Sequence, residues 1–332
     1  MKALAIRRYG APMEMMELPR PEPGPGELLV RVRAAGVNPI DHKIRDGAVK
    51  VLLPFSFPLV LGTDLAGDVE AIGPGVTKFK LGDAVYSRVD NDHIGAFAEY
   101  ALVRESAAAL KPARLDYAQA ASLPLVALTA WQALVELARL RAGQNVLIHA
   151  GSGGVGTVAI QLAKHLGARV STTAGARNHA LVRSLGADVA IDYRTTRFES
   201  VVKDQDVVLD TQGGDTLLRS FEVAKPNGVV VAIGGRPDGK FARAWGLSLP
   251  LVWILGFLNR KVDRLARKKR VRFEYLFMRA SGEQLERLGA LVDQGVIQPV
   301  VDKVFPFTAA TEAISYVESG RAVGKVVIRV AD

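Results

Sequence analysis

Over its first third, the chain places apolar residues in short runs separated by glycine- and proline-rich turns. Runs of this length, bounded by turns such as Gly73-Pro74-Gly75 and Gly82-Asp83, are typical of β-strands. The strands predicted within residues 1–122 are Leu28–Val32, Leu65–Ile72, Ala84–Val89 and Ala98–Val103. The pattern therefore predicts a β-rich first region.

From about Leu123 the pattern changes to short apolar runs that alternate with stretches of helical spacing. This alternation favours a parallel, doubly wound sheet with helices on its faces, an α/β fold. The strands predicted for this sheet are Asn145–Ala150, Arg169–Thr173, Val189–Asp192, Val207–Asp210, Val229–Gly234 and Phe273–Met278. After them we expect a helix over 285–292, a strand at 300–305, a helix over 310–317 and a last strand at 325–330.

A glycine-rich turn follows the first strand of this second region. Gly151, Gly153 and Gly156 fit the spacing G-x-G-x-x-G, and residues 157–166 continue at helical spacing. The first glycine allows a tight turn, the second lets backbone approach a pyrophosphate, and the third lets helix and strand pack closely. The helix N-terminus then offers free N–H groups to the anion. The dinucleotide-binding residues predicted here are Gly151, Ser152, Gly153, Gly154, Val155 and Gly156.

Composition is consistent with a globular enzyme. A chain of 332 residues, 49% hydrophobic and 23% charged, is expected to form two domains with a sizeable core. Cysteine is absent, which excludes disulfides and thiolate metal sites and fits a reducing compartment. The first residues lack the apolar region of a secretory signal, and no run of 18 apolar residues occurs. We therefore expect a cytoplasmic protein.

The loop after the second strand of the parallel sheet bears on the choice of cofactor. NAD-specific folds usually carry an acidic residue there, but this chain has none between Glu136 and Asp188. Arg177 supplies positive charge, and Asn178, Thr172 and Thr173 supply neutral donors for a 2′-phosphate. The sequence therefore predicts NADPH as cofactor, with a solvated loop arginine as the alternative explanation of Arg177.

Four further motifs are spread along nearly the whole chain: Ala35–Asp41 (A-G-V-N-P-I-D), Leu61–Gly67 (L-G-T-D-L-A-G), Gly95–Tyr100 (G-A-F-A-E-Y) and Gly324–Ile328 (G-K-V-V-I). In these the chain resembles the medium-chain dehydrogenases/reductases, in their zinc-free, quinone-oxidoreductase-like branch of zeta-crystallin and the alkenal/enone reductases. The resemblance implies a GroES-like catalytic domain over 1–122 and a Rossmann NADP-binding domain over 123–281, with an insertion at 236–272. Residues 282–332 are then expected to return to the catalytic domain.

A metal site is not expected. Zinc-dependent members of the family have Cys where this chain has Asn38 and His where it has Thr63, and they add a four-cysteine lobe. The five histidines (42, 93, 149, 165 and 179) show no ligand spacing.

The resemblance also adds residues to the expected cofactor site. Tyr193, after the third strand, matches the position of a tyrosine that reaches the 2′-phosphate. Thr129 is expected to hydrogen-bond the nicotinamide carboxamide. Gly234, Gly235 and Lys325 match further cofactor-binding positions of the family.

Two residues are candidates for catalysis. The alkenal/enone reductases carry V-N-P-x-D-x-K, and this chain has it at Val37–Lys43. Hydride delivery to a conjugated carbonyl builds negative charge on oxygen, which an ammonium or amide donor stabilises. We therefore expect Asn38 and Lys43 to contact the substrate. Alternatively, Asn38 shapes its loop and Lys43 pairs with Asp41 or Asp46.

These expectations define an NADPH-dependent, zinc-independent oxidoreductase that reduces a quinone or an α,β-unsaturated carbonyl, acting as a homodimer. An enoyl-thioester reductase of the same fold is the nearer alternative. The other is a membrane- or nucleic-acid-binding protein with vestigial redox activity. The intact glycine turn favours the enzyme.

One segment fits the family least well. Residues 236–272 hold eleven Lys or Arg and two Asp, and this surplus equals the whole net charge of +9. The segment also holds Trp245, Trp253 and the apolar run Leu249–Leu258, followed by a basic stretch of helical spacing. This composition is found in interfacial membrane anchors. A cover for the active site, a dimer contact and a simply solvated basic helix are the alternatives.

Overall fold

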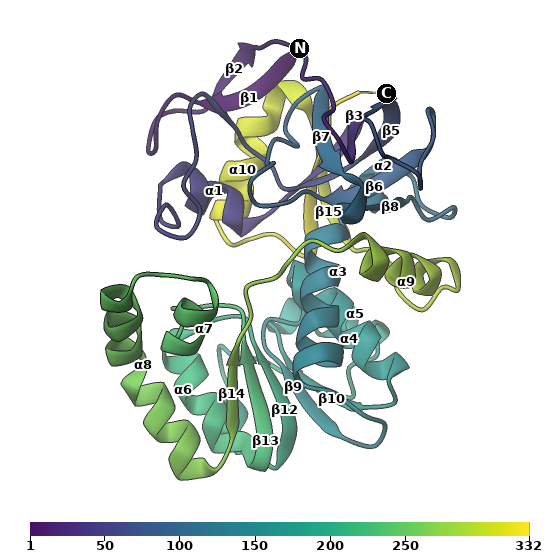
Figure 1. The fold of residues 1–332 in the computed structure, drawn as a ribbon. Coiled ribbons are helices and arrows are strands. Elements are labelled where there is room, and N and C mark those ends of the chain that lie inside the picture. The colour runs from purple at the N-terminus through teal and green to yellow at the C-terminus, as the bar shows by residue number, and fades with distance from the viewer. Residues whose placement is uncertain (332) are drawn as a thin grey trace. The chain divides into compact units, whose positions relative to one another are not determined.

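The computed structural model describes residues 1–331 (Figure 1). The chain divides into two units, of which the first joins Met1–Leu128 to Arg279–Asp332 and the second is Thr129–Met278. The first is rich in strands and the second alternates strands with helices. The predicted α/β class is confirmed.

The first unit is built around the long strand β3 (Glu27–Val37). Residues at alternate positions of β3, such as Leu28, Val30 and Val32, are buried in its core, as the two-residue period of a strand requires. β3 pairs antiparallel with β5 (Asp64–Ile72), with β7 (Tyr100–Arg104) along its first half and with β16 (Lys325–Arg329) at its end.

The remaining strands of this unit are β1 (Lys2–Ile6), β2 (Glu14–Glu17), β4 (Leu59–Val60), β6 (Ala84–Arg88), β8 (Ala108–Leu110) and β15 (Val301–Pro306). Its helices are α1 (Pro39–Arg45), α2 (Tyr117–Ala121), α9 (Gly282–Asp293) and α10 (Ala310–Glu318), and α3 (Pro124–Trp131) runs into the second unit. The strands predicted in this region are confirmed with shifted ends. β1, β2, β4 and β8 were not predicted, because they are short or carry few core residues.

The second unit is a parallel sheet in the order β11-β10-β9-β12-β13-β14. Its strands are β9 (Asn145–Ile148), β10 (Arg169–Thr173), β11 (Val189–Ile191), β12 (Gln205–Asp210), β13 (Ala224–Ala232) and β14 (Arg272–Tyr275). All six strand predictions are confirmed. The chain builds outward from β9 to β11 and then returns to place β12 on the other side of β9, so the order reverses between β9 and β12. Such a switch point is where doubly wound sheets bind their ligands.

Helices α4 (Gly154–His165), α5 (His179–Ser184) and α6 (Gly214–Val223) connect these strands. The basic segment 236–272 forms α7 (Gly239–Ala244) and the long helix α8 (Leu249–Lys269) before it enters β14. Figure 1 shows α8 at the outer flank of this unit, near α6. Among the described residues, no helix has both the length and the apolar character needed to cross a bilayer.

Candidate functional site

The glycine turn between β9 and α4 has no room for side chains. A Cβ built on Gly156 would lie 2.3 Å from the carbonyl oxygen of Ala150, and one on Gly151 would lie 2.0 Å from Oγ1 of Thr172. Gly153 caps α4, whose first N–H groups, those of Gly154, Val155 and Gly156, have no acceptor within the helix. The turn therefore exposes backbone donors at a helix N-terminus, as a pyrophosphate requires.

Three loops meet at the carboxyl edge of the sheet beside this turn. The hydroxyl of Thr211, after β12, donates to the carbonyl oxygen of His149, after β9, at 3.1 Å. Gly234 and Gly235, after β13, lie against the Thr211–Gly213 loop, since a Cβ on Gly213 would be 2.8 Å from the Gly235 nitrogen. The structure thus brings the predicted Gly234 and Gly235 to the switch point with the glycine turn.

The structure gives Thr173 a different place from the one expected. Its side chain is buried, and its hydroxyl accepts the Ala150 N–H at 3.1 Å and lies 3.2 Å from Nδ1 of His149. The neighbouring Thr172 is also buried and donates to the Ile148 carbonyl. Burial lowers the pKa of His149 to about 4, so a neutral imidazole supports Thr173. Both threonines are therefore buried and bond to the backbone that leads into the glycine turn, so they are not available to a phosphate.

The other residues predicted for the 2′-phosphate lie at the surface after β10 and β11. Arg177 is exposed, and Asn178 donates from Nδ2 to the Ser152 hydroxyl at 3.0 Å, which ties this loop to the glycine turn. Tyr193 is 60% exposed. The loop itself, residues 174–178, contains no carboxylate.

Arg194 was missed by the sequence analysis. A Cβ on Gly175 would lie 3.9 Å from both the Arg194 guanidinium and the Tyr193 ring, and the guanidinium carbon lies 5.8 Å from the centre of that ring. Arg194 and Tyr193 therefore flank the same loop as Arg177. The position of Arg194 directly after Tyr193 in the sequence could have suggested it as a phosphate-binding residue, but only the structure shows that the loops after β10 and β11 adjoin.

In the first unit, Asn38 is buried and its side chain is fully used by protein groups. Its Nδ2 donates to Oδ2 of Asp64 at 2.9 Å and to Oγ1 of Thr63 at 3.2 Å, and its Oδ1 accepts from Nζ of Lys325. Its backbone N–H donates to Asp41 at 2.7 Å. The geometry therefore favours the alternative in which Asn38 shapes its loop, because no amide hydrogen is left for a substrate.

Lys325 lies inside this network and not at a surface open to a cofactor. The residue is 5% exposed, and its ammonium group donates to the Val37 carbonyl at 2.9 Å, with Oδ2 of Asp64 at 3.5 Å. Burial raises the pKa of Asp64 and lowers that of Lys325, and each charge offsets the cost of burying the other. The structure thus gives Lys325 an internal role in the first unit, in place of the expected contact with the cofactor.

The same network bears on zinc. Asn38 and Thr63 stand at the positions of two zinc ligands in the zinc-dependent relatives, and the Lys325 ammonium already bonds to Asn38 and Asp64 there. A second positive charge among these groups would be repelled. Among residues 1–331, no group of three or more His, Asp or Glu could hold a metal ion. The residues present do not fit zinc.

Lys43, unlike the buried Lys325, lies at the surface. It is exposed on α1, and neither carboxylate named as its alternative partner pairs with it. Asp46 pairs with Arg45 at 2.7 Å, while buried Asp41 accepts the N–H of Asn38 and the hydroxyl of Thr63. Lys43 forms no ion pair within the described chain. Thr129, the other candidate near the nicotinamide, is buried in α3.

The fold and these residues define a class: a doubly wound parallel sheet with a glycine turn, joined to a β-rich unit whose described residues do not fit zinc. The family profile "Alcohol dehydrogenase GroES-like domain" matches residues 24–113, and the profile "Zinc-binding dehydrogenase" matches residues 185–328. The zebrafish (Danio rerio) mitochondrial NAD(P)H oxidoreductase RTN4IP1 is 35% identical over 93% of this chain and 84% of its own. The Arabidopsis thaliana chloroplastic NADPH-dependent alkenal/one oxidoreductase is 35% identical over 99% of this chain and 79% of its own.

A solved structure of the quinone oxidoreductase from Coxiella burnetii superposes with a TM-score of 0.87, at 34% identity and 99% coverage of both chains. The chain belongs to the medium-chain dehydrogenase/reductase family, in its quinone-oxidoreductase-like branch. The predicted GroES-like and Rossmann architecture is confirmed. The predicted cytoplasmic location and homodimer stay predictions.

The buried Asp41 gives the first unit a pH dependence that can be tested. Burial raises its pKa from 3.8 to about 7, so the folded chain keeps a proton that the unfolded chain has lost. The contribution of Asp41 to the free energy of unfolding is therefore fully present below about pH 4 and is lost as the pH rises through about 7. When the free energy of unfolding is measured in urea at a series of pH values, Asp41→Asn should make its decrease between about pH 4 and 7 smaller. Asp215→Asn, which changes an exposed carboxylate of α6, should keep it, and equal slopes in all three proteins would contradict the assignment.

Proposed function

We propose that this protein is an NADPH-dependent, zinc-independent reductase of quinones or α,β-unsaturated carbonyl compounds. The observation that carries the proposal is the cationic surface after β10, where Arg194 lies beside a loop, residues 174–178, that carries Arg177 and no carboxylate. A 2′-phosphate is a dianion, and arginine binds phosphate through paired N–H donors. An NAD-specific site would instead place a carboxylate there for the ribose hydroxyls.

The residues that would hold the cofactor lie on one edge of the parallel sheet. The glycine turn would bind the pyrophosphate, while Arg177, Asn178, Tyr193 and Arg194 would bind the 2′-phosphate. Gly234 and Gly235 let backbone come close at the switch point. When bound, the nicotinamide supplies a hydride.

The substrate class is supported by Lys43 and by the names of two relatives, a quinone oxidoreductase and an alkenal/one oxidoreductase. Reduction of a conjugated carbonyl leaves negative charge on the carbonyl oxygen. An exposed ammonium group without a carboxylate partner can donate a hydrogen bond to that oxygen and stabilise the charge. Lys43 meets this description, and water can then protonate the carbon.

A substrate panel tests the proposed function directly. We expect NADPH oxidation, followed at its absorbance maximum, with quinones, 2-alkenals or enones, and activity that survives exhaustive chelation. Turnover of an enoyl thioester alone would favour the thioester reductase. No turnover with any member would favour a binding protein with vestigial redox activity.

Removing Arg177 tests the cofactor assignment. Arg177→Ala should raise KM for NADPH by about ten- to a hundredfold through the loss of one charge-assisted contact, while NADH kinetics barely change. Arg183→Ala removes an exposed arginine from the end of α5 and serves as the matched control. An equal loss with both cofactors would show that Arg177 has a structural role.

Removing Lys43 tests the chemical step. Lys43→Met should lower kcat by about ten- to a thousandfold with KM for NADPH nearly kept, because the lost donor acts on charge that develops during reduction. Lys50→Met, at an exposed position on the segment after α1, should retain kcat. With a deuterium isotope effect showing hydride transfer to be rate-limiting, an unchanged kcat in Lys43→Met would rule out the contact.

A further inference from the structure

The outer face of α8 is divided along its length into an apolar and a cationic half. Its first half exposes Leu249, Trp253, Ile254, Phe257 and Leu258, with Trp253 76% and Phe257 62% exposed. These positions follow the three- and four-residue spacing of one helix face. Large side chains exposed in a contiguous patch usually mark a surface that binds a partner or a membrane.

The same face continues into a cationic half over the last turns of the helix. Lys261, Arg264 and Lys268 are exposed there, and none of them pairs with a carboxylate within residues 1–331. At the junction, the Arg260 guanidinium lies 4.0 Å from the centre of the Phe257 ring. The charged end of Arg260 thus lies over the face of an aromatic ring, a cation–π contact at the boundary between the halves.

The inner face of α8 fixes the helix to the unit. Val262 and Ala266 are buried in the core with Phe221 of α6 and Phe273 of β14, and Nδ2 of the buried Asn259 donates to the Pro237 carbonyl at 2.7 Å. The outer face is therefore presented on a rigid support, and its exposure does not come from a detached helix.

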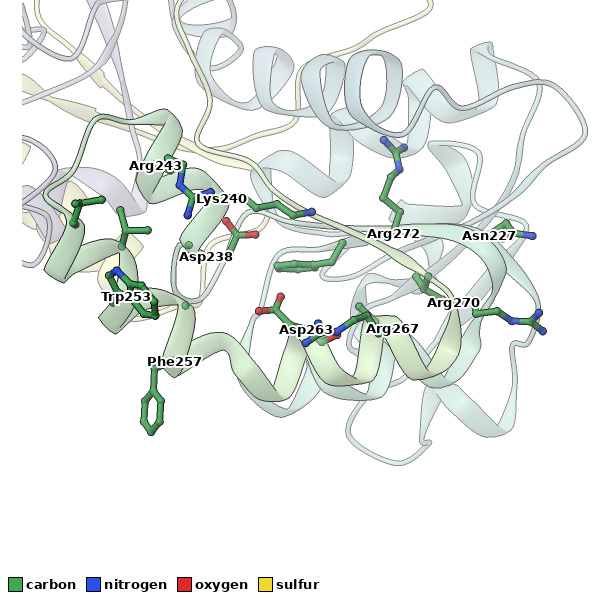
Figure 2. Close-up of a pocket in the computed structure, with 17 residues that line it drawn as sticks. Asn227, Asp238, Lys240, Arg243, Trp253, Phe257, Asp263, Arg267, Arg270 and Arg272 are labelled. Carbon is green, nitrogen blue, oxygen red and sulfur yellow. The ribbon is translucent and has the colours of Figure 1, made fainter.

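A hollow of about 1010 Å³ lies beside this helix, between α7, α8 and β14 (Figure 2). Figure 2 shows Trp253 at one end of it and Arg267 and Arg270 toward the other, and Leu249, Trp253 and Phe257 of the apolar half are among its lining residues. The lining contains two carboxylates, Asp238 and Asp263, and more cations, which are Lys240, Arg243, Arg267, Arg270 and Arg272. The surroundings of the face thus add to its positive charge.

We propose that the outer face of α8 is a docking surface for an anionic lipid bilayer. The apolar half enters the interface between headgroups and acyl chains, and the cationic half contacts the anionic headgroups. Ten residues of helix span about 15 Å, enough to reach the usual depth of about 5–10 Å at a tilt.

Charge complementarity favours a bilayer over other occupants. A second copy of this chain would bring the same cationic half and offer no opposite charge. Nucleic acid would match the cations but would leave Leu249, Ile254 and Leu258 without an apolar environment. An anionic bilayer matches both halves at once.

Co-sedimentation with vesicles tests the proposal. The protein should bind phosphatidylcholine vesicles that contain phosphatidylglycerol, be released at high salt, and ignore phosphatidylcholine alone. Lys261→Gln/Arg264→Gln should bind about thirtyfold more weakly. Arg169→Gln/Arg183→Gln removes the same charge from exposed positions of β10 and α5 and should bind normally. An equal loss in both pairs would overturn the proposal.

The apolar half is tested separately. Trp253→Ser/Phe257→Ser changes only exposed side chains and should weaken binding about a hundredfold. Because the chain has no cysteine, Phe257→Cys can carry a single environment-sensitive dye, whose emission should shift to the blue on anionic vesicles. A dye at Leu81→Cys, 62% exposed in the other unit, should not respond.

Two results would reject the bilayer. The first is normal vesicle binding by Trp253→Ser/Phe257→Ser, which would reduce the cationic half to a general anion surface. The second is absence of vesicle binding by the unaltered protein. If sedimentation velocity without lipid also shows that the serine variant has lost a dimer, the face is a contact between copies.

Discussion

The contact of the Lys325 ammonium with Asp64 is the charge interaction on which the interior of the β-rich unit depends, and the buried guanidinium of Arg88 adds a second positive charge that acts on Asp64 and Asp41. The ammonium group lies with Asn38 and Asp64, and a further buried carboxylate, Asp41, is close enough to act on the charges of the cluster. An uncompensated buried charge costs several kcal/mol, so neither Lys325 nor Asp64 can be removed alone without a large loss of stability. Lys325 comes from β16, near the end of the chain, while Asn38 directly follows β3 and Asp64 begins β5. The last strand therefore completes the electrostatics of a unit that begins at the first residue.

On the short helix α1, one residue contributes to the buried charge network and another is exposed and can contact a substrate. Asp41 and Lys43 are two residues apart on α1, and side chains at that spacing point to different sides. Asp41 turns into the buried network, and Lys43 turns to the surface. Because the side-chain amide of Asn38 forms hydrogen bonds with Thr63, Asp64 and Lys325, Lys43 remains the better candidate to stabilise negative charge on a substrate. The lysine inside the network takes up the carboxylate and amide oxygens that a metal would need.

The sequence predicted what depends on local pattern and left out what depends on tertiary pairing. The period of apolar residues and the glycine spacing located the parallel sheet and its nucleotide-binding turn, because both follow from backbone geometry. Thr173 and Lys325 were assigned to the cofactor from position alone, but their polar atoms pair with residues distant in sequence. Arg194 was missed for the same reason, since its closeness to Gly175 arises only when β10 and β11 pair.

The net charge of the protein also has a local origin. Of 43 Lys and Arg, eleven lie in residues 236–272, against two of 34 Asp and Glu, so the rest of the chain is electrically balanced. The basic character thus belongs to α7, α8 and the start of β14 and not to the nucleotide site, whose few arginines suit a single phosphate. In the sheet, β12 and β13 stand between β9 and β14, which separates these strands by roughly 14 Å. Charge on α8 would therefore attract an anionic bilayer without competing with the glycine turn for a dinucleotide, and the proposed docking would bring the protein to where apolar substrates partition into lipid.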